Sequence, residues 1–139
     1  MKSISPYIRK PHFYETDQMG IVHHANYIHW FEEARVDFMD QIGFGYDDTT
    51  QSGVDIAVIS VNCEYKKAVK YGDVMEVYCS IKELKPATMT VEYVIKNADT
   101  GEIYTTGESR HCFMDKEHGL VRLNRKLPEL FELFKEQTQ

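Results

Sequence analysis

The sequence has few of the residues that build disulfide-bonded or metal-stabilised scaffolds. Its three cysteines, Cys63, Cys79 and Cys112, are widely spaced, odd in number and without a Cys-x-x-Cys pair. This pattern favours buried, reduced thiols over disulfides or a metal site, as is typical of a cytoplasmic protein. The first ten residues also lack the apolar segment of a secretory signal, so a cytoplasmic location is predicted.

Long hydrophobic runs and an excess of positive charge are missing as well. No apolar stretch approaches the roughly 18 residues that a membrane-spanning helix needs. The net charge of −6 does not favour binding to nucleic acid or to an anionic membrane surface. Hydrophobic residues make up 42% of the 139 positions, which is enough to fill one core. Residues 1–139 are therefore predicted to form a single domain.

One long helical pattern is present before the C-terminal region. Between residues 25 and 42, apolar side chains recur every three or four positions and cover more than one face, which predicts a buried helix. Asn26 is predicted to cap its N-terminus and Gly43 to end it. Glu33 and Arg35, on its polar side, are predicted to form an ion pair.

The rest of the chain up to residue 115 has the patterns of strands. Apolar and polar residues alternate in three segments, which predicts half-buried strands at residues 54–65, 75–82 and 89–96. A last long strand is predicted at residues 102–114. A first strand is predicted at residues 5–15, a loop at 43–53 and a short strand at 120–123. Turn residues at 71–73, 85–87 and 97–101 predict that consecutive strands are antiparallel neighbours. An amphipathic helix with Pro128 in its first turn closes the chain.

These elements predict an α+β domain in which an antiparallel sheet of about five strands wraps around one long central helix. Such a sheet covers the helix on one side only and leaves an open edge. A homodimer is therefore predicted, and beyond it a dimer of dimers. Ser60 and Asn62 point away from the predicted core, where they are candidates for lining a substrate channel.

An acid, Asp17, lies nine residues before the predicted cap Asn26, with Gly20 between them. Gly20 permits a sharp turn and a close approach of the backbone to a ligand. The turn brings the carboxylate towards the donor-rich N-terminus of the helix, where backbone N–H groups can hold an oxyanion. A carboxylate there can attack a carbonyl or deprotonate water. On the residues alone, a turn hydrogen bond is the more common use of such an aspartate, and Glu15 is a weaker alternative base.

The run Tyr14-Glu-Thr-Asp17-Gln-Met-Gly20-Ile-Val-His-His24-Ala-Asn26-Tyr27, continuing to Arg35, closely resembles the signature of the 4-hydroxybenzoyl-CoA thioesterase family. These proteins are acyl-CoA thioesterases with the hotdog fold. Residues 64–73 are similar to a second family pattern, with Ala68 where the family usually has proline. The resemblance covers about residues 7 to 125. It implies hydrolysis of acyl-CoA to free CoA and a carboxylic acid, with no cofactor beyond water.

The resemblance also assigns site residues. Asp17 falls on the catalytic aspartate of the family, and the backbone N–H near His24 on its oxyanion donor. A further role of the His24 side chain, in positioning thioester or water, stays open. The family pairs sheets edge to edge and places its active sites between subunits. Gly20, Asn26 and Tyr27 are expected to shape the substrate site, although Asn26 also suits a cap and Tyr27 the core.

Lys66, Lys67 and Lys70 form the densest basic cluster of this acidic chain. They are predicted to attract the phosphates of CoA, with Lys67 favoured because the family often has a basic residue there. His23, His24 and His29 lack the His-x-x-x-His spacing of a helical metal site, so no metal is predicted.

Two other functions remain open from the sequence. A hydratase or dehydratase of the same fold would pair a histidine with an acid, and no second acid is well placed beside His24. A non-catalytic acyl-CoA-binding module would bind the ester and leave it intact.

Overall fold

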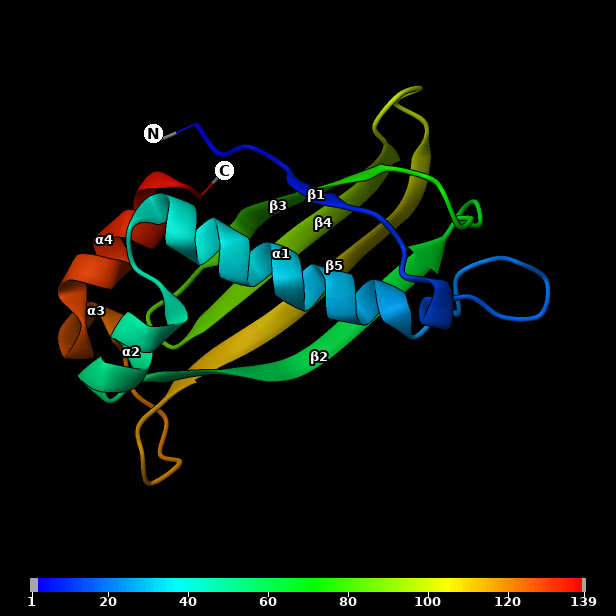
Figure 1. Ribbon diagram of the computed structural model, residues 1–139. Helices are drawn as coiled ribbons and strands as arrows, with labels where there is room; N and C mark the ends of the chain where they lie inside the picture. The colour runs from blue at the N-terminus through cyan, green and yellow to red at the C-terminus, as the bar shows by residue number, and fades with distance from the viewer. Residues whose placement is uncertain (1–2, 139) are drawn as a thin grey trace.

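A computed structural model describes residues 3–138 and shows one curved antiparallel sheet with a long helix lying in its concave face (Figure 1). The sheet has the strand order β1-β3-β4-β5-β2. Its strands are β1 (Tyr7–Arg9), β2 (Asp55–Tyr65), β3 (Met75–Leu84), β4 (Thr88–Asn97) and β5 (Ile103–Met114). The helices are α1 (Asn26–Ile42), α2 (Tyr46–Ser52), α3 (Leu123–Lys126) and α4 (Pro128–Glu136), with a 3-10 turn, η1 (Phe13–Glu15). The predicted α+β fold is confirmed.

Helix α1 fills the centre of the molecule because apolar side chains cover most of its circumference. Its buried residues are Tyr27, Trp30, Phe31, Ala34, Phe38, Met39 and Ile42. Phe31 stacks on Tyr93 of β4, with ring centroids 4.2 Å apart. Gly107 of β5 lies directly beneath this pair, where a β-carbon would come within 2.6 Å of the Phe31 ring. The close approach of helix and sheet therefore requires glycine at this position.

The ends of α1 differ from the prediction at one residue. Gly43 ends the helix in the left-handed conformation, with φ of 89°, as predicted. At the other end Ala25 occupies the cap position and Asn26 is already helical. The Asn26 side-chain amide instead donates to the backbone carbonyls of Glu15 and His23. The predicted capping role of Asn26 is therefore wrong, since its side chain is used to hold the preceding segment.

The sheet topology corrects the prediction that all consecutive strands are neighbours. Strands β3, β4 and β5 do pair in sequence order, but β2 pairs with β5 and not with β3. Residues 66–74 therefore form a crossover from one edge of the sheet towards the other, past the ends of β4 and β5 (Figure 1). Turn residues mark where a chain reverses, but they do not determine which strand it then joins.

Three shorter segments also differ from the predictions. Residues 13–15 form η1 and not the end of a strand, and α2 occupies the predicted loop at 43–53. In place of the predicted strand at 120–123, Leu120 makes one isolated bridge to Met114 and α3 begins at Leu123. The C-terminal helix α4, with Pro128 as its first residue, is confirmed.

The predicted Glu33–Arg35 ion pair is absent. Glu33 accepts a hydrogen bond from Arg9 of β1 at 2.9 Å, and Arg35 donates to the Tyr93 hydroxyl at 2.9 Å. The two residues lie on different sides of α1, so each binds the strand that faces it. Within residues 3–138, no helix is both long and apolar enough to cross a bilayer.

Candidate active site

The segment that leads into α1 is anchored by the buried carboxylate of Glu15, which is 4% exposed. Its two oxygens accept hydrogen bonds from the Arg9 guanidinium at 2.9 and 3.0 Å, the His12 N–H at 2.6 Å and the Trp30 indole N–H at 3.0 Å. Burial raises the pKa of Glu15, but these donors together outweigh burial and hold that pKa below its ordinary value. Glu15 is therefore a structural residue, contrary to its suggested role as an alternative base.

The backbone of Glu15 positions the start of α1. Its carbonyl accepts hydrogen bonds from the His23 N–H at 2.8 Å and from the Asn26 side-chain amide at 3.0 Å. Among the residues that the structure describes, the backbone N–H of His24 makes no hydrogen bond. A free N–H donor at the N-terminal end of a helix can bind an anion or a developing oxyanion.

Asp17 lies in the loop between η1 and α1. Thr16 and Val22 form a β-bridge, and the Gly20 N–H donates to the Asp17 carbonyl at 3.0 Å, which closes a turn in which Gly20 has φ of 78°. One Asp17 carboxylate oxygen accepts from the Met19 N–H at 2.8 Å, and the side chain is exposed. The turn expected at Gly20 is thus present, and in the single chain the Asp17 carboxylate faces solvent.

A groove of about 240 Å³ lies beside the N-terminal end of α1, and we call it the His24 groove. It is lined by Ile21, Val22, His24, Tyr27, Tyr65, Lys66, Lys67 and Ala68. The Tyr65 hydroxyl donates to the His24 carbonyl at 2.9 Å, and the buried Tyr27 hydroxyl accepts from the Val69 N–H at 3.2 Å. The fold thus brings the start of α1 and the residues after β2 together. The predicted site residues that meet in this groove are His24, Tyr27, Lys66 and Lys67.

The three lysines of the crossover have different surroundings. The Lys67 ammonium lies 2.5 Å from a carboxylate oxygen of Glu102, and the Lys66 ammonium lies 3.6 Å from Glu64. Lys70 is exposed, and its ammonium has no ion-pair partner among residues 3–138. Its backbone bridges to Ile21, which is a wall residue of the His24 groove.

Several predicted residues lie outside the groove. Asp17 and Gly20 precede the groove residue Ile21 in the same loop, and Asn26 is half-buried against the segment that precedes α1. Asn62 lines a hollow of about 610 Å³ on the sheet face away from α1, together with Glu64, Glu92 and Glu108. The structure therefore does not bring Asn62 to the start of α1.

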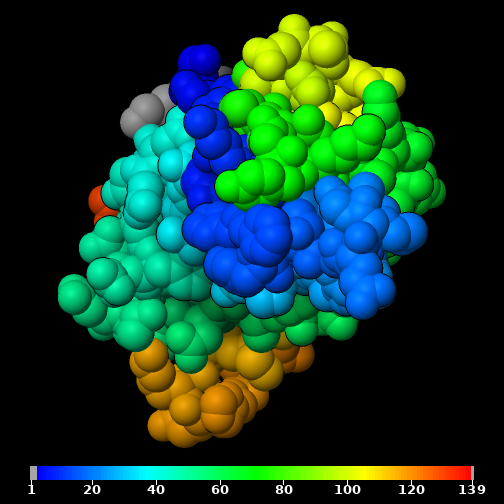
Figure 2. Space-filling view, turned by 45° about the vertical axis from the view of Figure 1, so that its right-hand side comes forward, coloured from blue at the N-terminus to red at the C-terminus, as the bar shows by residue number. Residues whose placement is uncertain are grey.

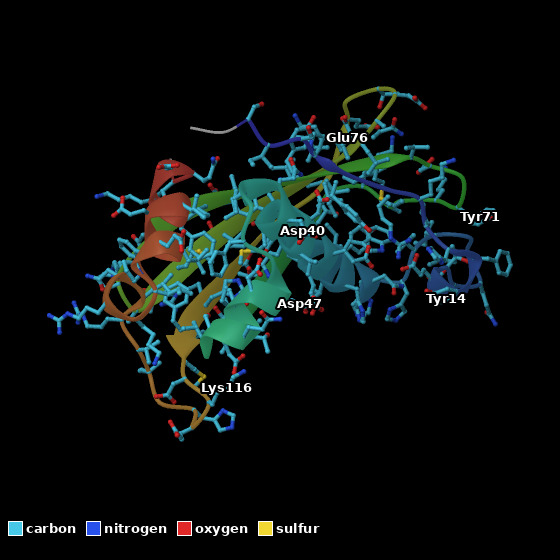
Figure 3. All side chains as sticks on the ribbon, turned by 60° about the vertical axis from the view of Figure 1, so that its left-hand side comes forward. Tyr14, Asp40, Asp47, Tyr71, Glu76 and Lys116 are labelled. Atoms are coloured by element: carbon cyan, nitrogen blue, oxygen red, sulfur yellow. The ribbon has the colours of Figure 1, made fainter. Side chains whose placement is uncertain are left out.

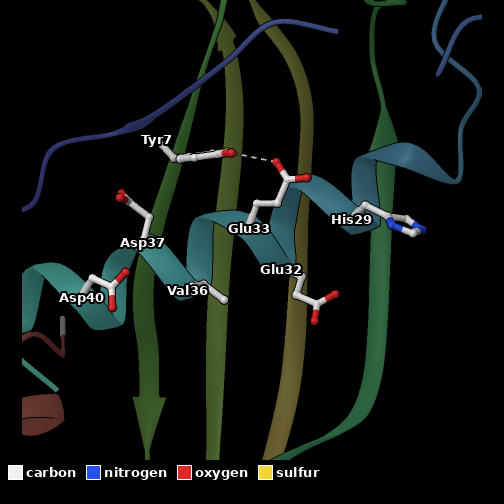
Figure 4. A pocket seen from close by; sticks show the side chains of 7 residues that line it. All are labelled: Tyr7, His29, Glu32, Glu33, Val36, Asp37 and Asp40. Carbon is white, nitrogen blue, oxygen red and sulfur yellow. Dashed lines mark hydrogen bonds between the residues drawn. The ribbon is translucent and has the colours of Figure 1, made fainter. Parts of the chain in front are cut away.

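A third hollow, of about 490 Å³, lies over the outer surface of α1 (Figure 4). It is lined mainly by Glu32, Glu33, Asp37 and Asp40, and the Tyr7 hydroxyl donates to Glu33 across it at 2.8 Å. These acids make it unsuitable for an anionic ligand. No group of three or more His, Cys, Asp or Glu within residues 3–138 is arranged to hold a metal ion.

The sheet order and the enclosed α1 define a hotdog-fold protein, in which the start of the central helix forms one wall of a groove. Residues 11–137 match the pattern of the Thioesterase-like superfamily. The chain belongs to this family, and the prediction of a thioester hydrolase is confirmed at the level of the family.

Relatives of known structure show the same fold over nearly the whole chain. A DHNA-CoA thioesterase from Staphylococcus aureus is 30% identical, with a TM-score of 0.89 over 95% of this chain and 89% of that one. A protein of Aquifex aeolicus is 35% identical, with a TM-score of 0.84 over 92% of this chain and 97% of that one. A relative found by sequence, a Bacillus subtilis protein named "Putative acyl-CoA thioesterase YneP", is 39% identical over 74% of each chain.

Proposed function

We propose that this protein hydrolyses acyl-CoA thioesters to free CoA and a carboxylic acid. The membership of the Thioesterase-like superfamily and the relatives named as CoA thioesterases support this reaction. The observation that carries the proposal is the loop at 17–22, in which the exposed Asp17 carboxylate and the groove residue Ile21 lie on one turn beside the N-terminus of α1.

In the proposed reaction the thioester carbonyl lies at the start of α1. Its oxygen accepts a hydrogen bond from the free His24 N–H, which stabilises the negative charge that develops as the carbonyl is attacked. Asp17 either removes a proton from the attacking water or attacks the carbonyl itself to form an anhydride that water then opens. In both routes the C–S bond breaks and the sulfur leaves as the CoA thiol with one proton from water. Because Asp17 is exposed in a single chain, the proposal includes a second copy that encloses the site.

Asp17→Asn tests this proposal. The variant keeps the size of the side chain and the acceptor for the Met19 N–H but loses the basic oxygen, so we expect hydrolysis to fall by about 10²- to 10⁴-fold. The melting temperature is expected to change little because the side chain is exposed. Release of free thiol from a panel of acyl-CoA esters measures the activity.

Asp115→Asn is the matched control. The Asp115 carboxylate accepts from the backbone N–H two residues later, that of Glu117, at 3.0 Å, as Asp17 does from Met19. The control variant is expected to keep full activity. Retention of most activity by Asp17→Asn would refute the assignment of Asp17, and binding of acyl-CoA without any thiol release by the unaltered protein would favour a binding module.

A further inference from the structure

The end of the molecule that carries the Asp17 loop also exposes aromatic side chains. Phe13, Tyr14 and Tyr71 are 76%, 79% and 60% exposed, and we call them the aromatic patch. The rings of Phe13 and Tyr71 are in edge contact, with centroids 5.7 Å apart, although they are far apart in the sequence. Tyr14 and Tyr71 project from the same end of the molecule (Figure 3).

Large exposed aromatic surfaces held together in this way mark binding sites, because their exposure to water is otherwise unfavourable. In the space-filling view, η1 and the crossover at 66–74 form one continuous surface (Figure 2). The patch is therefore assembled by the fold and is not a single stray side chain.

The patch continues into the His24 groove. Tyr71 follows Lys70, whose backbone bridges to the groove residue Ile21. The crossover therefore borders the groove at residues 66–68 and the aromatic patch at residue 71. A long ligand with its reactive end at the start of α1 can follow this segment outward to the aromatic rings.

The lysines near the patch differ in how readily each could bind an anionic ligand. Lys66 and Lys67 each lie near a carboxylate, whereas Lys70 beside Tyr71 has no ion-pair partner among residues 3–138. An ammonium without a partner can neutralise a phosphate with no ion pair to break. Aromatic rings beside a free lysine form a surface that suits a phosphorylated nucleotide, since bases stack on such rings.

We propose that Phe13 and Tyr71 form a platform for the adenine ring of CoA and that Lys70, not Lys67, binds its phosphates. This subsite rests on the proposed function, because an acyl-CoA substrate provides a nucleotide at one end and a thioester at the other. The platform would hold the nucleotide outside the His24 groove while the thioester lies inside it.

Binding of CoA itself, measured by calorimetry, tests the subsite without any chemical step. The double variant Phe13→Leu/Tyr71→Leu keeps apolar surface but removes the aromatic faces. We expect it to weaken CoA binding by about 5- to 100-fold and to leave the binding of pantetheine, which has no nucleotide, unchanged. Lys70→Ala is expected to weaken CoA binding and to reduce its dependence on salt more than Lys67→Ala does.

Leu120→Ala and Lys116→Ala are the matched controls. Leu120 is 69% exposed and bridges to Met114 at the end of β5. Lys116 is 52% exposed, its ammonium lies 3.6 Å from Asp55, and Figure 3 places it at the opposite end of the molecule from Tyr71. Neither control is expected to alter CoA binding.

Three outcomes would overturn the subsite. The unaltered protein could bind CoA no more tightly than pantetheine, or the double leucine variant could keep full affinity for CoA. The same variant could instead keep its CoA affinity and lose binding to anionic phospholipid vesicles, which would assign the patch to a membrane. If it kept its CoA affinity and changed its oligomer size, the patch would be a contact with a second copy. Hydrolysis of an N-acetylcysteamine thioester, which lacks the nucleotide, reports separately on the proposed reaction and does not depend on this subsite.

Discussion

At the scale of single residues, the site depends on a carboxylate with no direct part in the chemistry. Glu15 joins β1, η1 and α1 through Arg9 and Trp30, and its backbone fixes His23 beside the groove. The Arg9 guanidinium also lies over the Trp30 ring, 5.5 Å from its centroid. A buried tryptophan N–H requires an acceptor, and that requirement was the one sequence signal that could have identified Glu15 as structural.

Glu15→Gln tests this role. The substitution keeps the shape but removes the charge opposite Arg9, so we expect a loss of about 1–3 kcal/mol in the free energy of unfolding. Activity is expected to fall as well, because the loop that carries Asp17 loses its anchor. Denaturant unfolding and the thiol-release assay measure the two effects.

Glu83→Gln provides the comparison for Glu15→Gln. Glu83 lies 3.7 Å from the Lys85 ammonium, and both side chains are more than half exposed. Its substitution is expected to change stability by less than about 1 kcal/mol. If the two substitutions lower the free energy of unfolding equally, the burial of Glu15 against Arg9 and Trp30 does not determine how much Glu15 stabilises the fold.

At the scale of elements, the sequence predicted what depends on local periodicity. Helix α1, the inner faces of β3 and β4 and the start of α4 follow from side-chain spacing, and all are confirmed. The position of β2 beside β5 was not predictable, because strand pairing depends on contacts distant in sequence. The same limit applies to the site: the Asp17 turn could be located, but the groove depends on a tertiary contact between Tyr65 and His24.

Strand β2 lies at an edge of the sheet, and its residues Val58 and Ile59 are 55% and 47% exposed. A long, apolar edge strand tends to pair with another copy, so we expect a homodimer formed through β2. Val58→Lys/Ile59→Lys places two charges on this edge and should shift the protein to monomers in sedimentation velocity. Because Asp17 is exposed in a single chain, the monomer should also lose activity.

Ile8→Lys is the control at the opposite edge. Ile8, on β1, is also 55% exposed, and its substitution should leave the dimer intact. A wild-type protein that sediments as a monomer, or a dimer that survives the double lysine variant, would contradict pairing through β2.

At the scale of the whole molecule, a chain of polar groups crosses the core under α1. The Arg35 guanidinium donates to the Tyr93 hydroxyl at 2.9 Å, that hydroxyl lies 2.6 Å from the Ser109 hydroxyl, and Ser109 lies 2.6 Å from His111 Nε2. His111 is fully buried. Burial and the positive charge of Arg35 lower the pKa of His111 to about 4, so the imidazole is neutral in the folded protein at pH 7.

This histidine makes the stability of the fold sensitive to acid. In the unfolded chain the pKa of His111 returns to its ordinary value of 6.5, so the unfolded state binds more protons between about pH 6.5 and 4. Stability is therefore unaffected above this window and falls as the pH decreases through it, by about 3 kcal/mol in all.

The variant His111→Gln cannot take up this proton, so its unfolding free energy should lack that component. The difference in unfolding free energy between the wild type and His111→Gln, measured by urea titration from pH 7 to 4, should shift by about 3 kcal/mol against the wild type. Other acid-sensitive groups, including Glu15, are common to both proteins and cancel in this difference. A difference that stays constant across the window would show that His111 is not held neutral by the core.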